Sequence, residues 1–300
     1  MTVAEQQPAL TAGRSTISWH QRKSVRSAVG KTIAMVLLIG LGILFVAPVL
    51  WMMSSSVKDN LHVLDGQWIP STWHWSNFKQ AWSLNGANFN QYARNTLVIT
   101  FSTVIGVTLS SSLVAYSFAR LRWPGRDLVF ILVLATMLLP GIVLFIPQFI
   151  IWSKLGFVDT YIPLVLPAWF GAPFYIFLLR QFYRGIPDDL SDAARVDGAS
   201  EIRIWWQIIM PLARPALTAV AIFSFTGSWE DFFNPLIYIN TRSKFTLQLG
   251  LDVFSNNYGG FPEYNLLMAV GLIIMLPVII FYFIGQRYFI EGVTLTGLKG

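Results

Sequence analysis

Long apolar runs without charged residues alternate with short polar segments along this chain. Four of these runs are each as long as the roughly 20 residues that a helix needs to cross a bilayer: 32–57, 95–119, 128–153 and 160–179. Two more follow at 215–239, where Glu230 and Asp231 are the only charges, and at 264–286. Because an ionised side chain at the bilayer centre costs at least about 2.5 kcal/mol, the pattern predicts six transmembrane helices.

The composition supports an integral membrane protein of the all-α class. Hydrophobic residues make up 54% of the 300 residues and charged residues 12%, whereas about a quarter of a soluble domain is charged. No repeat or low-complexity linker divides the sequence. We therefore expect an N-terminal tail at 1–31, one transmembrane domain at 32–288 and a C-terminal tail at 289–300.

A signal peptide, cleaved near residues 54–56, is the alternative interpretation of the first apolar run. The apolar core of a signal peptide has about 7 to 15 residues. This run is longer, so we expect it to be retained as a membrane helix.

Lysine and arginine are distributed unevenly among the connections. The N-terminal tail, the second and fourth connections and the C-terminal tail together carry 15 of the 21 positive side chains. Since cytoplasmic segments carry the excess of positive charge, both termini and the 187–212 connection are expected in the cytoplasm. This topology also accounts for the sequence pI of about 9.6, so we expect no nucleic acid partner.

The connection at 187–212 is long for a simple chain reversal and has the signals of two helices. Pro187 and the acids after it favour a helix start, and Gly198 favours a stop because glycine readily takes the left-handed conformation. Ser200 can cap a second helix from Glu201 to Met210, which Pro211 limits.

The second of these helices is amphipathic. Its spacing places Ile202, Trp205, Ile209 and, one position round, Trp206 on an apolar face, with Arg203 and Gln207 four residues apart on another. Two interpretations remain open on this pattern: a surface that another protein binds, and a helix that lies on lipid headgroups.

The same connection resembles the EAA loop of ABC importer permeases, the cytoplasmic segment that sits in a cleft of the ATPase subunit. The resemblance gives the coupling role to Asp192, Ala193, Ala194, Asp197, Gly198, Ala199 and Pro211, and all of these except Asp192 match family positions. Asp192 departs from the glutamate common in the family, which shortens the carboxylate's reach toward an ATPase arginine by one methylene.

The resemblance extends over nearly the whole chain after the N-terminal tail and points to the carbohydrate, maltose-like branch. The segments that carry it are NTL at 95–97, YSFARLRWPGR at 116–126, PG at 140–141, RQF at 180–182 and QRYFIEG at 286–292. In that branch the tail can enter the ATPase interface, but this tail reads TLTG at 294–297 where small residues are more usual.

The resemblance implies a permease subunit that forms half of an inward pathway for a sugar or oligosaccharide in the cytoplasmic membrane of a prokaryote. Its implied partners are a second permease chain, two ATP-binding subunits, an extracytoplasmic solute-binding protein and membrane lipid. ATP and Mg would then bind on the ATPase partners, and this chain would bind no cofactor. Which sugar it carries, or whether a glycerol-phosphate-type compound takes its place, stays open.

The segment 229–235, WEDFFNP, contains the candidate pathway residues Trp229, Glu230, Asp231 and Asn234. A helix rise of ~1.5 Å per residue from Pro215 puts Glu230 about 22 Å into a core about 30 Å thick, where an ionisable group indicates a functional site. The alternative is that the helix begins later and both acids lie at the outer interface. Related permeases often read Trp-Asn-Asp here, so Glu230 adds a negative charge.

Enzymatic chemistry is not indicated by the residue inventory. The chain has no G-x-x-x-x-G-K-[ST] phosphate loop, its three histidines lie outside the apolar runs and indicate no metal site, and Ser110–Ser112 favour helix packing over nucleophilic catalysis. Prolines at 140, 147, 163, 167, 173, 235 and 277 interrupt the runs, either as ordinary kinks of membrane helices or as in transporters whose broken helices line cavities. Two other classes remain open: an ion-coupled secondary transporter that uses Glu230 and Asp231, and a structural or receptor subunit.

Overall fold

The computed structural model describes residues 23–83, 88–257 and 263–297, and the regular structure in these residues is all helical, with no β-strand. The chain divides into two compact units, Met1–Met52 and Met53–Gly300, which are described separately. Most of the predicted N-terminal tail, residues 1–22, and the last three residues lie outside the described part.

The first unit consists, in its described part, of most of helix α1 (Lys23–Ser56). The helix starts before the predicted position 32, and the stretch Ser27–Ser56 is long and apolar enough to cross a membrane. Its large apolar side chains are exposed, Leu38 by 70% and Phe45 by 75%. Side chains of this kind all round a helix are typical of a segment that faces lipid.

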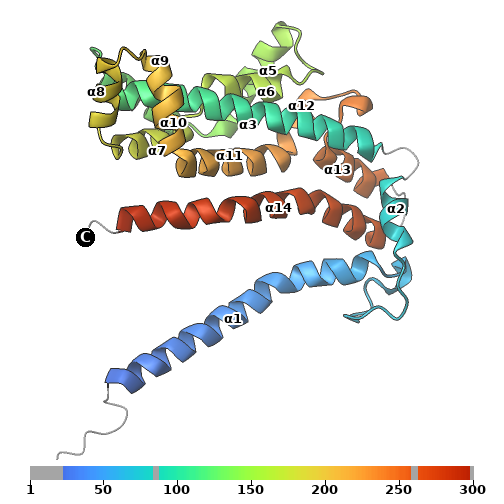
Figure 1. Cartoon of the computed structure of the whole chain (residues 1–300). Helices are drawn as coiled ribbons and strands as arrows, with labels where there is room; N and C mark the ends of the chain where they lie inside the picture. The colour runs from blue at the N-terminus through green and yellow to red at the C-terminus, as the bar shows by residue number, and fades with distance from the viewer. Residues whose placement is uncertain (1–22, 84–87, 258–262, 298–300) are drawn as a thin grey trace, which may run out of the picture. The chain divides into compact units, whose positions relative to one another are not determined.

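The second unit is built around helix α3 (Phe89–Arg120). It packs along α7 (Pro173–Arg184) and α11 (Arg214–Trp229), and α11 in turn packs on α14 (Tyr264–Gly297). These helices run side by side in Figure 1. The other helices of the unit are α2 (Ser76–Trp82), α4 (Arg126–Ala135), α5 (Gly141–Lys154), α6 (Ile162–Val165), α8 (Asp189–Val196), α9 (Glu201–Ile204), α10 (Met210–Leu212), α12 (Phe233–Tyr238) and α13 (Leu247–Asn257), with short 3₁₀ turns η2 (Asn60–His62), η3 (Thr136–Leu138), η4 (Leu166–Phe170) and η6 (Arg242–Lys244) and one π-helical turn, η5 (Trp205–Ile209).

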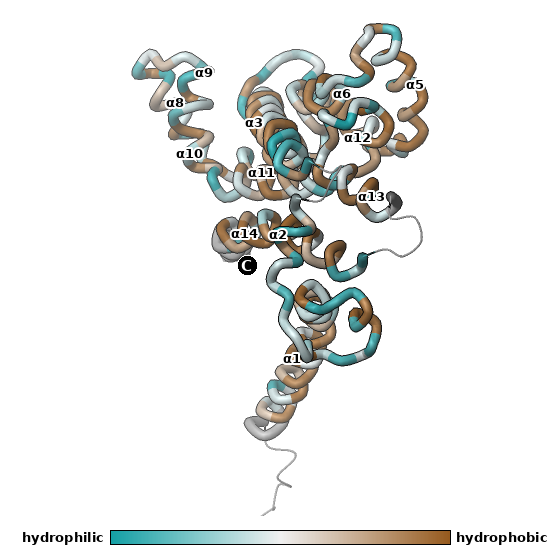
Figure 2. Tube along the Cα trace, turned by 90° about the vertical axis from the view of Figure 1, so that its right-hand side faces the viewer, coloured by the Kyte–Doolittle hydropathy of each residue, from teal (hydrophilic) through white to brown (hydrophobic). Residues whose placement is uncertain are grey.

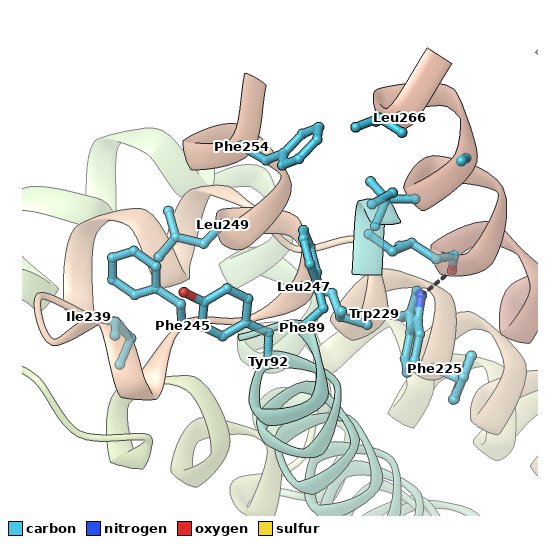
Figure 3. Packing of buried hydrophobic residues seen from close by; sticks show 14 residues of the cluster. Phe89, Tyr92, Phe225, Trp229, Ile239, Phe245, Leu247, Leu249, Phe254 and Leu266 are labelled. Carbon is cyan, nitrogen blue, oxygen red and sulfur yellow. Dashed lines mark hydrogen bonds between the residues drawn. The ribbon is translucent and has the colours of Figure 1, made fainter. Parts of the chain in front are cut away.

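Two clusters of buried side chains hold this unit together, one toward each end of α3. The first gathers aromatic residues from α3, α11, α13 and the 239–247 segment, among them Phe89, Tyr92 and Trp229 (Figure 3). The second gathers Tyr116, Tyr183 and Trp205 with aliphatic residues of α7, α9 and α11. Because both clusters include α3, this helix fixes the positions of the segments at either end.

Four described helices are long and apolar enough to cross a membrane: Ser27–Ser56, Phe89–Arg120, Ile162–Arg184 and Tyr264–Gln286. Two further pairs pass the same test only when each bent pair is taken together, which gives up to six spans. Five of the six lie on predicted apolar runs. In the pair Glu201–Leu212 and Arg214–Trp229 only the second helix does, since Glu201–Leu212 belongs to the predicted cytoplasmic loop. Helix α14 continues past the predicted end of the last run to Gly297. Figure 2 shows the apolar colouring of α14 against the polar segments of α8 and α9.

The run predicted as one helix at 128–153 is broken. The helices Arg126–Leu138 and Gly141–Lys154 meet at a bend of 97°. Leu139, the residue before Pro140, is extended (φ −80°, ψ 118°), as the clash between a proline ring and the preceding residue requires. A second bend of 83° separates Glu201–Leu212 from Arg214–Trp229, next to Pro211 and Pro215.

The predicted helix at 215–239 also ends early. Helix α11 stops at Trp229, Glu230 is its C-cap, and a separate short helix, α12, begins at Phe233. Pro235 lies in the first turn of α12, where its missing N–H costs no helical hydrogen bond. The acids at 230 and 231 therefore lie in a break between two helices.

Candidate functional site

The 187–212 segment forms the predicted pair of short helices joined at a glycine. Helix α8 ends at Val196, and Gly198 takes the left-handed conformation with φ +79°. Ser200 then caps α9, since its Oγ accepts a hydrogen bond from the Arg203 N–H at 3.4 Å. Asp189, Asp192 and Glu201 lie in the first turns of their helices, where the dipole favours acids.

A charged network holds the two helices at a fixed angle. Arg195 of α8 donates from Nε to Glu201 Oε1 at 2.7 Å and from Nη1 to Asp192 Oδ1 at 2.6 Å. The Tyr116 hydroxyl of α3 donates to the other oxygen of Glu201. The hydrogen bond from Arg195 lowers the pKa of Glu201, and the same contact raises the pKa of Arg195. Both groups are therefore charged at neutral pH, and the network connects α8, α9 and the end of α3.

The apolar residues of the second helix divide between two faces. Trp205 and Ile209 are buried in the second core cluster together with Ile204. Ile202 and Trp206, which we predicted on the same face, are 62% and 55% exposed. The π-helical turn at Trp205–Ile209 shifts the register within the helix, and Ile204 and Ile209, five residues apart, both lie in the buried cluster. Arg203 and Gln207, predicted four residues apart on the other face, are joined by a hydrogen bond from Arg203 Nε to Gln207 Oε1 at 2.8 Å.

Both helices of the loop carry exposed apolar side chains: Leu190, Val196, Ile202 and Trp206, with Val196 exposed by 88%. We call these four residues the docking face. Acidic Asp189, Asp192 and Asp197 lie on the same two-helix segment. An apolar face with a charged rim is typical of a protein interface.

The seven predicted coupling residues all lie in this segment. Asp192, Ala193, Asp197, Gly198 and Pro211 are exposed, whereas Ala194 and Ala199 are half-buried against the second core cluster. Asp192 already accepts a hydrogen bond from Arg195 within the chain. Its carboxylate is therefore partly engaged before any partner binds.

Three consecutive serines of α3 attach the segment before the loop. Ser110 Oγ donates to Ala168 O at 3.0 Å, and Ser111 Oγ accepts from Ala172 N–H at 3.0 Å. Both contacts satisfy backbone groups freed where the chain breaks at Gly171 (φ +86°). Ser112 Oγ contacts the Tyr183 hydroxyl at 2.6 Å and accepts from Trp205 Nε1 at 2.9 Å. The serines thus have the predicted packing role.

A cavity of about 410 Å³ lies between α3, the η4–α7 break and α11. Its volume falls in the range of about 300–1,000 Å³ usual for small-molecule sites. Hydroxyl, apolar and acidic groups share its lining, which includes Thr96, Thr103, Tyr175, Ser224, Ser228 and Asp231. The Thr103 hydroxyl is buried with no hydrogen-bond partner among the described residues. Three of the predicted interrupting prolines, at 167, 173 and 235, also line the cavity.

The four predicted pathway residues are not equivalent. Asp231 lines the cavity, and its carboxylate accepts from the backbone N–H and the side-chain amide of Asn234 at 3.1 and 2.9 Å. Glu230 is exposed and is not part of the lining. Trp229 is only 3% exposed, stacks on Phe225 and donates from Nε1 to Ile274 O at 2.9 Å (Figure 3). Trp229 is therefore a core residue in this structure.

The hydroxyl residues of α3 and α11 were not singled out from the sequence. Lining residues of each segment recur three or four positions apart. On α3 they are Thr96, Ile99, Thr103 and Val107, and on α11 and just after it they are Ser224, Gly227 or Ser228, and Asp231. This spacing places each set on one helical face. These polar residues could have been found in the sequence, because they recur at helical spacing inside otherwise apolar runs. Among the described residues no group of three or more His, Asp or Glu side chains is placed to hold a metal ion.

Residues 106–294 match the family model described as "Binding-protein-dependent transport system inner membrane component". The chain belongs to this family. The match covers the second half of α3, α7, α11, the two-helix loop and most of α14, and so includes most of the elements described above.

Curated relatives of the permease include several sugar transport components. It is 32% identical to the diacetylchitobiose uptake system permease protein NgcG of Streptomyces coelicolor over 84% of this chain and 83% of that protein. It is 36% identical to the arabinooligosaccharides transport system permease protein AraQ of Halalkalibacterium halodurans, over 77% and 81% of the two chains. It is 34% identical to the trehalose transport system permease protein SugB of Mycobacterium tuberculosis, over 84% and 92%. The relatives thus agree with the carbohydrate branch.

Solved structures share the fold. A chain of a bacterial ABC transporter involved in the import of the acidic polysaccharide alginate superposes with a TM-score of 0.79 at 23% identity, over 89% of this chain and 98% of that one. A chain of a bacterial alginate ABC transporter in complex with alginate pentasaccharide-bound periplasmic protein gives 0.63 at 14% identity, over 89% and 96%. The chain is therefore a multi-pass membrane protein with an ABC permease fold.

Proposed function

We propose that this chain is one of two permease subunits of an ATP-driven importer that moves a sugar or oligosaccharide into the cell. The observation that carries the proposal is the 187–212 loop. There, Arg195 and Glu201 hold two helices at a fixed angle while the docking face stays exposed. A rigid segment with an exposed apolar face is suited to transmit the movement of an ATPase subunit to the transmembrane helices.

The proposed coupling residues are the seven at 192–194, 197–199 and 211, within the loop at 187–212. ATP and Mg bind on two partner ATPase subunits, and a second permease chain and an extracytoplasmic solute-binding protein complete the assembly. Family membership, the sugar transport names of the relatives and the alginate complex with its periplasmic protein support these partners.

The proposed topology has six crossings in a transmembrane domain at 32–288, in which the bent pair at 126–154 counts as one crossing, the fifth crossing begins after the cytoplasmic 187–212 loop, and both terminal tails lie in the cytoplasm. The distribution of positive charge supports this orientation. It places the loop and the end of α3 at the cytoplasmic surface of a prokaryotic inner membrane. The break at 230–232 and the 239–246 segment then lie toward the outside.

The cavity beside α3 is the proposed substrate pathway in this subunit. Sugar hydroxyls both donate and accept hydrogen bonds, and the lining offers matching groups in Thr103, Tyr175, Ser228 and Asp231. Of the four predicted pathway residues, we propose that Asp231 contacts the sugar and that Asn234 holds the Asp231 carboxylate in place. We assign Trp229 to packing and Glu230 to the exposed helix end.

The test is uptake into proteoliposomes that contain the permease, its partner permease, the ATPase and the solute-binding protein. Labelled diacetylchitobiose, arabino-oligosaccharides and trehalose are suitable probes, given the relatives' names. We expect uptake of at least one sugar that requires ATP and continues when an ionophore collapses the membrane gradients. Uptake that stops with the ionophore although ATP is present would instead identify an ion-coupled transporter that uses Asp231 and Glu230.

A further inference from the structure

A basic cavity lies behind the coupling loop, on the side of α3 and α7. Its volume is about 780 Å³, and its walls come from the end of α3, the start of α4, the end of α7 and helices α8 and α9. Five arginines and three acids line it, giving a net charge of +2: Arg120, Arg122, Arg126, Arg184, Arg195, Asp188, Asp192 and Glu201. We call it the arginine cavity.

Three of these arginines are occupied by contacts within the chain. Arg120 donates to Tyr183 O at 2.8 Å and to Ile186 O, and it pairs with Asp188. Arg126 donates to Leu121 O and contacts Asp127 at 3.1 Å. Arg195 belongs to the network with Glu201. These side chains build the walls of the cavity.

Arg122 and Arg184 differ from the other three arginines because, in the described part of the chain, no contact holds their guanidinium groups. Both are exposed, both line the cavity, and neither has a hydrogen-bond or ion-pair partner among the residues that the structure describes. Ser191, only 1% exposed and also in the lining, has a hydroxyl without a partner in the same residues. Two unpaired guanidinium groups and a hydroxyl around one hollow are the donors that a phosphate group needs.

A second hollow of about 350 Å³ continues from the first, since both include Arg122 and Arg126. It reaches Trp123 and Leu128 at the start of α4. From there the apolar side chains of α4 are exposed, Leu128 by 64%, Ile131 by 61% and Leu132 by 58%. Arginines followed directly by an exposed apolar helix match a lipid that has its headgroup in the cavity and an acyl chain along α4.

We propose that the arginine cavity binds the phosphate group of an anionic phospholipid through Arg122 and Arg184. Free phosphate or pyrophosphate offers the same chemistry and is the alternative source. The lipid source rests on the proposed cytoplasmic placement of the loop, whereas the phosphate site itself does not. Bound phosphate would neutralise the excess positive charge behind the loop and join the α3–α4 connection to α7.

The test measures binding without transport. The full-length permease is placed in nanodiscs of phosphatidylcholine alone or with phosphatidylglycerol or cardiolipin, and retained lipid is counted by native mass spectrometry. A parallel titration uses pyrophosphate in detergent and follows thermal unfolding. We expect preferential retention of anionic lipid, weakened about tenfold or more in Arg122→Gln/Arg184→Gln. The matched control is Arg242→Gln, an exposed arginine outside the cavity, which should bind lipid like the wild type.

The other outcomes are also decisive. Pyrophosphate binding that depends on Arg122 and Arg184, with no lipid preference, would support the phosphate site and identify a free anion as its source. Equal binding of both probes by wild type and double variant would overturn the proposal. So would protection of both arginines from phenylglyoxal by the ATPase subunit alone, because a protein segment would then fill the cavity. The variant Arg122→Lys/Arg184→Lys, which keeps both charges, should retain most binding and controls for misfolding.

Discussion

The guanidinium of Arg195 reaches across the turn at Gly198 to the carboxylate of Glu201, with Nε and Oε1 2.7 Å apart. The two residues belong to different helices, α8 and α9. The glycine allows the turn, and the ion pair sets the angle between the helices after it. The shape of the docking face therefore depends on two polar residues outside that face.

We expect Glu201→Gln to reduce sugar uptake several-fold while the complex still assembles. The pair is partly exposed, so its loss lowers the free energy of unfolding by no more than about 1 kcal/mol and the fold is kept. The neutral amide binds Arg195 and Tyr116 less strongly, so the angle between α8 and α9 is held less firmly. The measurement is uptake and ATPase activity of the same preparation, where uncoupling appears as ATP hydrolysis without uptake. The control is Asp189→Asn, an acid on α8 outside the network. Equal loss in both variants would mean that general charge, not the pair, matters.

Gly198→Val should abolish uptake. At φ +79° a β-branched residue is strained by about 1–3 kcal/mol, although no atom lies within 4 Å of the position a Cβ would take. The cost is therefore conformational, and α9 must shift relative to α8. Uptake by the reconstituted complex is the measurement.

The matched control for this prediction is Gly66→Val. Gly66 also has a positive φ, +76°, and open space around it, but it lies outside the loop. It should lose similar stability and keep most uptake. Normal uptake by Gly198→Val would show that the glycine is not a required joint.

The positions of the apolar segments could be predicted from the sequence because hydropathy is a local property. The helix stop at Gly198 and the cap at Ser200 were predictable for the same reason, since each acts on backbone within a few residues. The bend at Pro140 was marked by its proline, but its angle of 97° depends on packing against other helices.

The features that could not be predicted depend on helix register and on contacts between distant segments. An α-helical period placed Ile202, Trp205, Ile209 and Trp206 on one apolar face, but only Trp205 and Ile209 are buried, and a π-helical turn changes the period between them. Trp229, a predicted pathway residue, is buried and donates a hydrogen bond to Ile274 O, 45 residues later in the chain, a contact that no local pattern shows. The arginine cavity unites α3, α7, α8 and α9, which no local pattern brings together.

Gly250→Ala should destabilise the second unit by about 1–3 kcal/mol, the usual cost of overpacking. Gly250 lies on α13, and an added Cβ would overlap the ring of Tyr92, which is only 3% exposed and cannot move aside easily. Thermal unfolding of the purified permease measures the effect. Gly42→Ala, at a helical glycine with open space around it, should be neutral or slightly stabilising. A neutral Gly250→Ala would mean that α13 shifts without cost.

The contribution of Asp159 to stability should depend on pH. Its carboxylate accepts from Lys244 Nζ at 2.8 Å, from Thr241 Oγ1 at 2.6 Å and from two backbone N–H groups of the 239–246 segment. The hydrogen bond from Lys244, followed by those from Thr241 and Asn240, lowers the pKa of Asp159 below its ordinary value of 3.8. A lowered folded-state pKa stabilises the fold above the unfolded value and loses that effect as the pH falls through the folded one.

We therefore expect wild type to be more stable than Asp159→Asn above about pH 4. The difference in Tm between the two proteins should shrink steadily as the pH is lowered further. Thermal unfolding between pH 3 and pH 7, with both proteins in the same detergent, measures it. A difference that stays constant over this range would mean that the charge of Asp159 is not what holds the segment.

Asp231 and Glu230 should respond differently to neutralisation. Asp231 lines the cavity, whereas Glu230 is exposed at the end of α11 and does not. A hydrogen bond to a charged group contributes about 1.5–3 kcal/mol, so Asp231→Asn should raise the sugar concentration for half-maximal uptake by about tenfold or more. Glu230→Gln should change it less than about twofold, because surface charges contribute little. ATP-driven uptake by each mutant complex, measured over a range of sugar concentrations, tests this. Since both variants remove one negative charge from adjacent positions, equal effects would contradict a direct contact by Asp231 and indicate a general electrostatic role for the helix break.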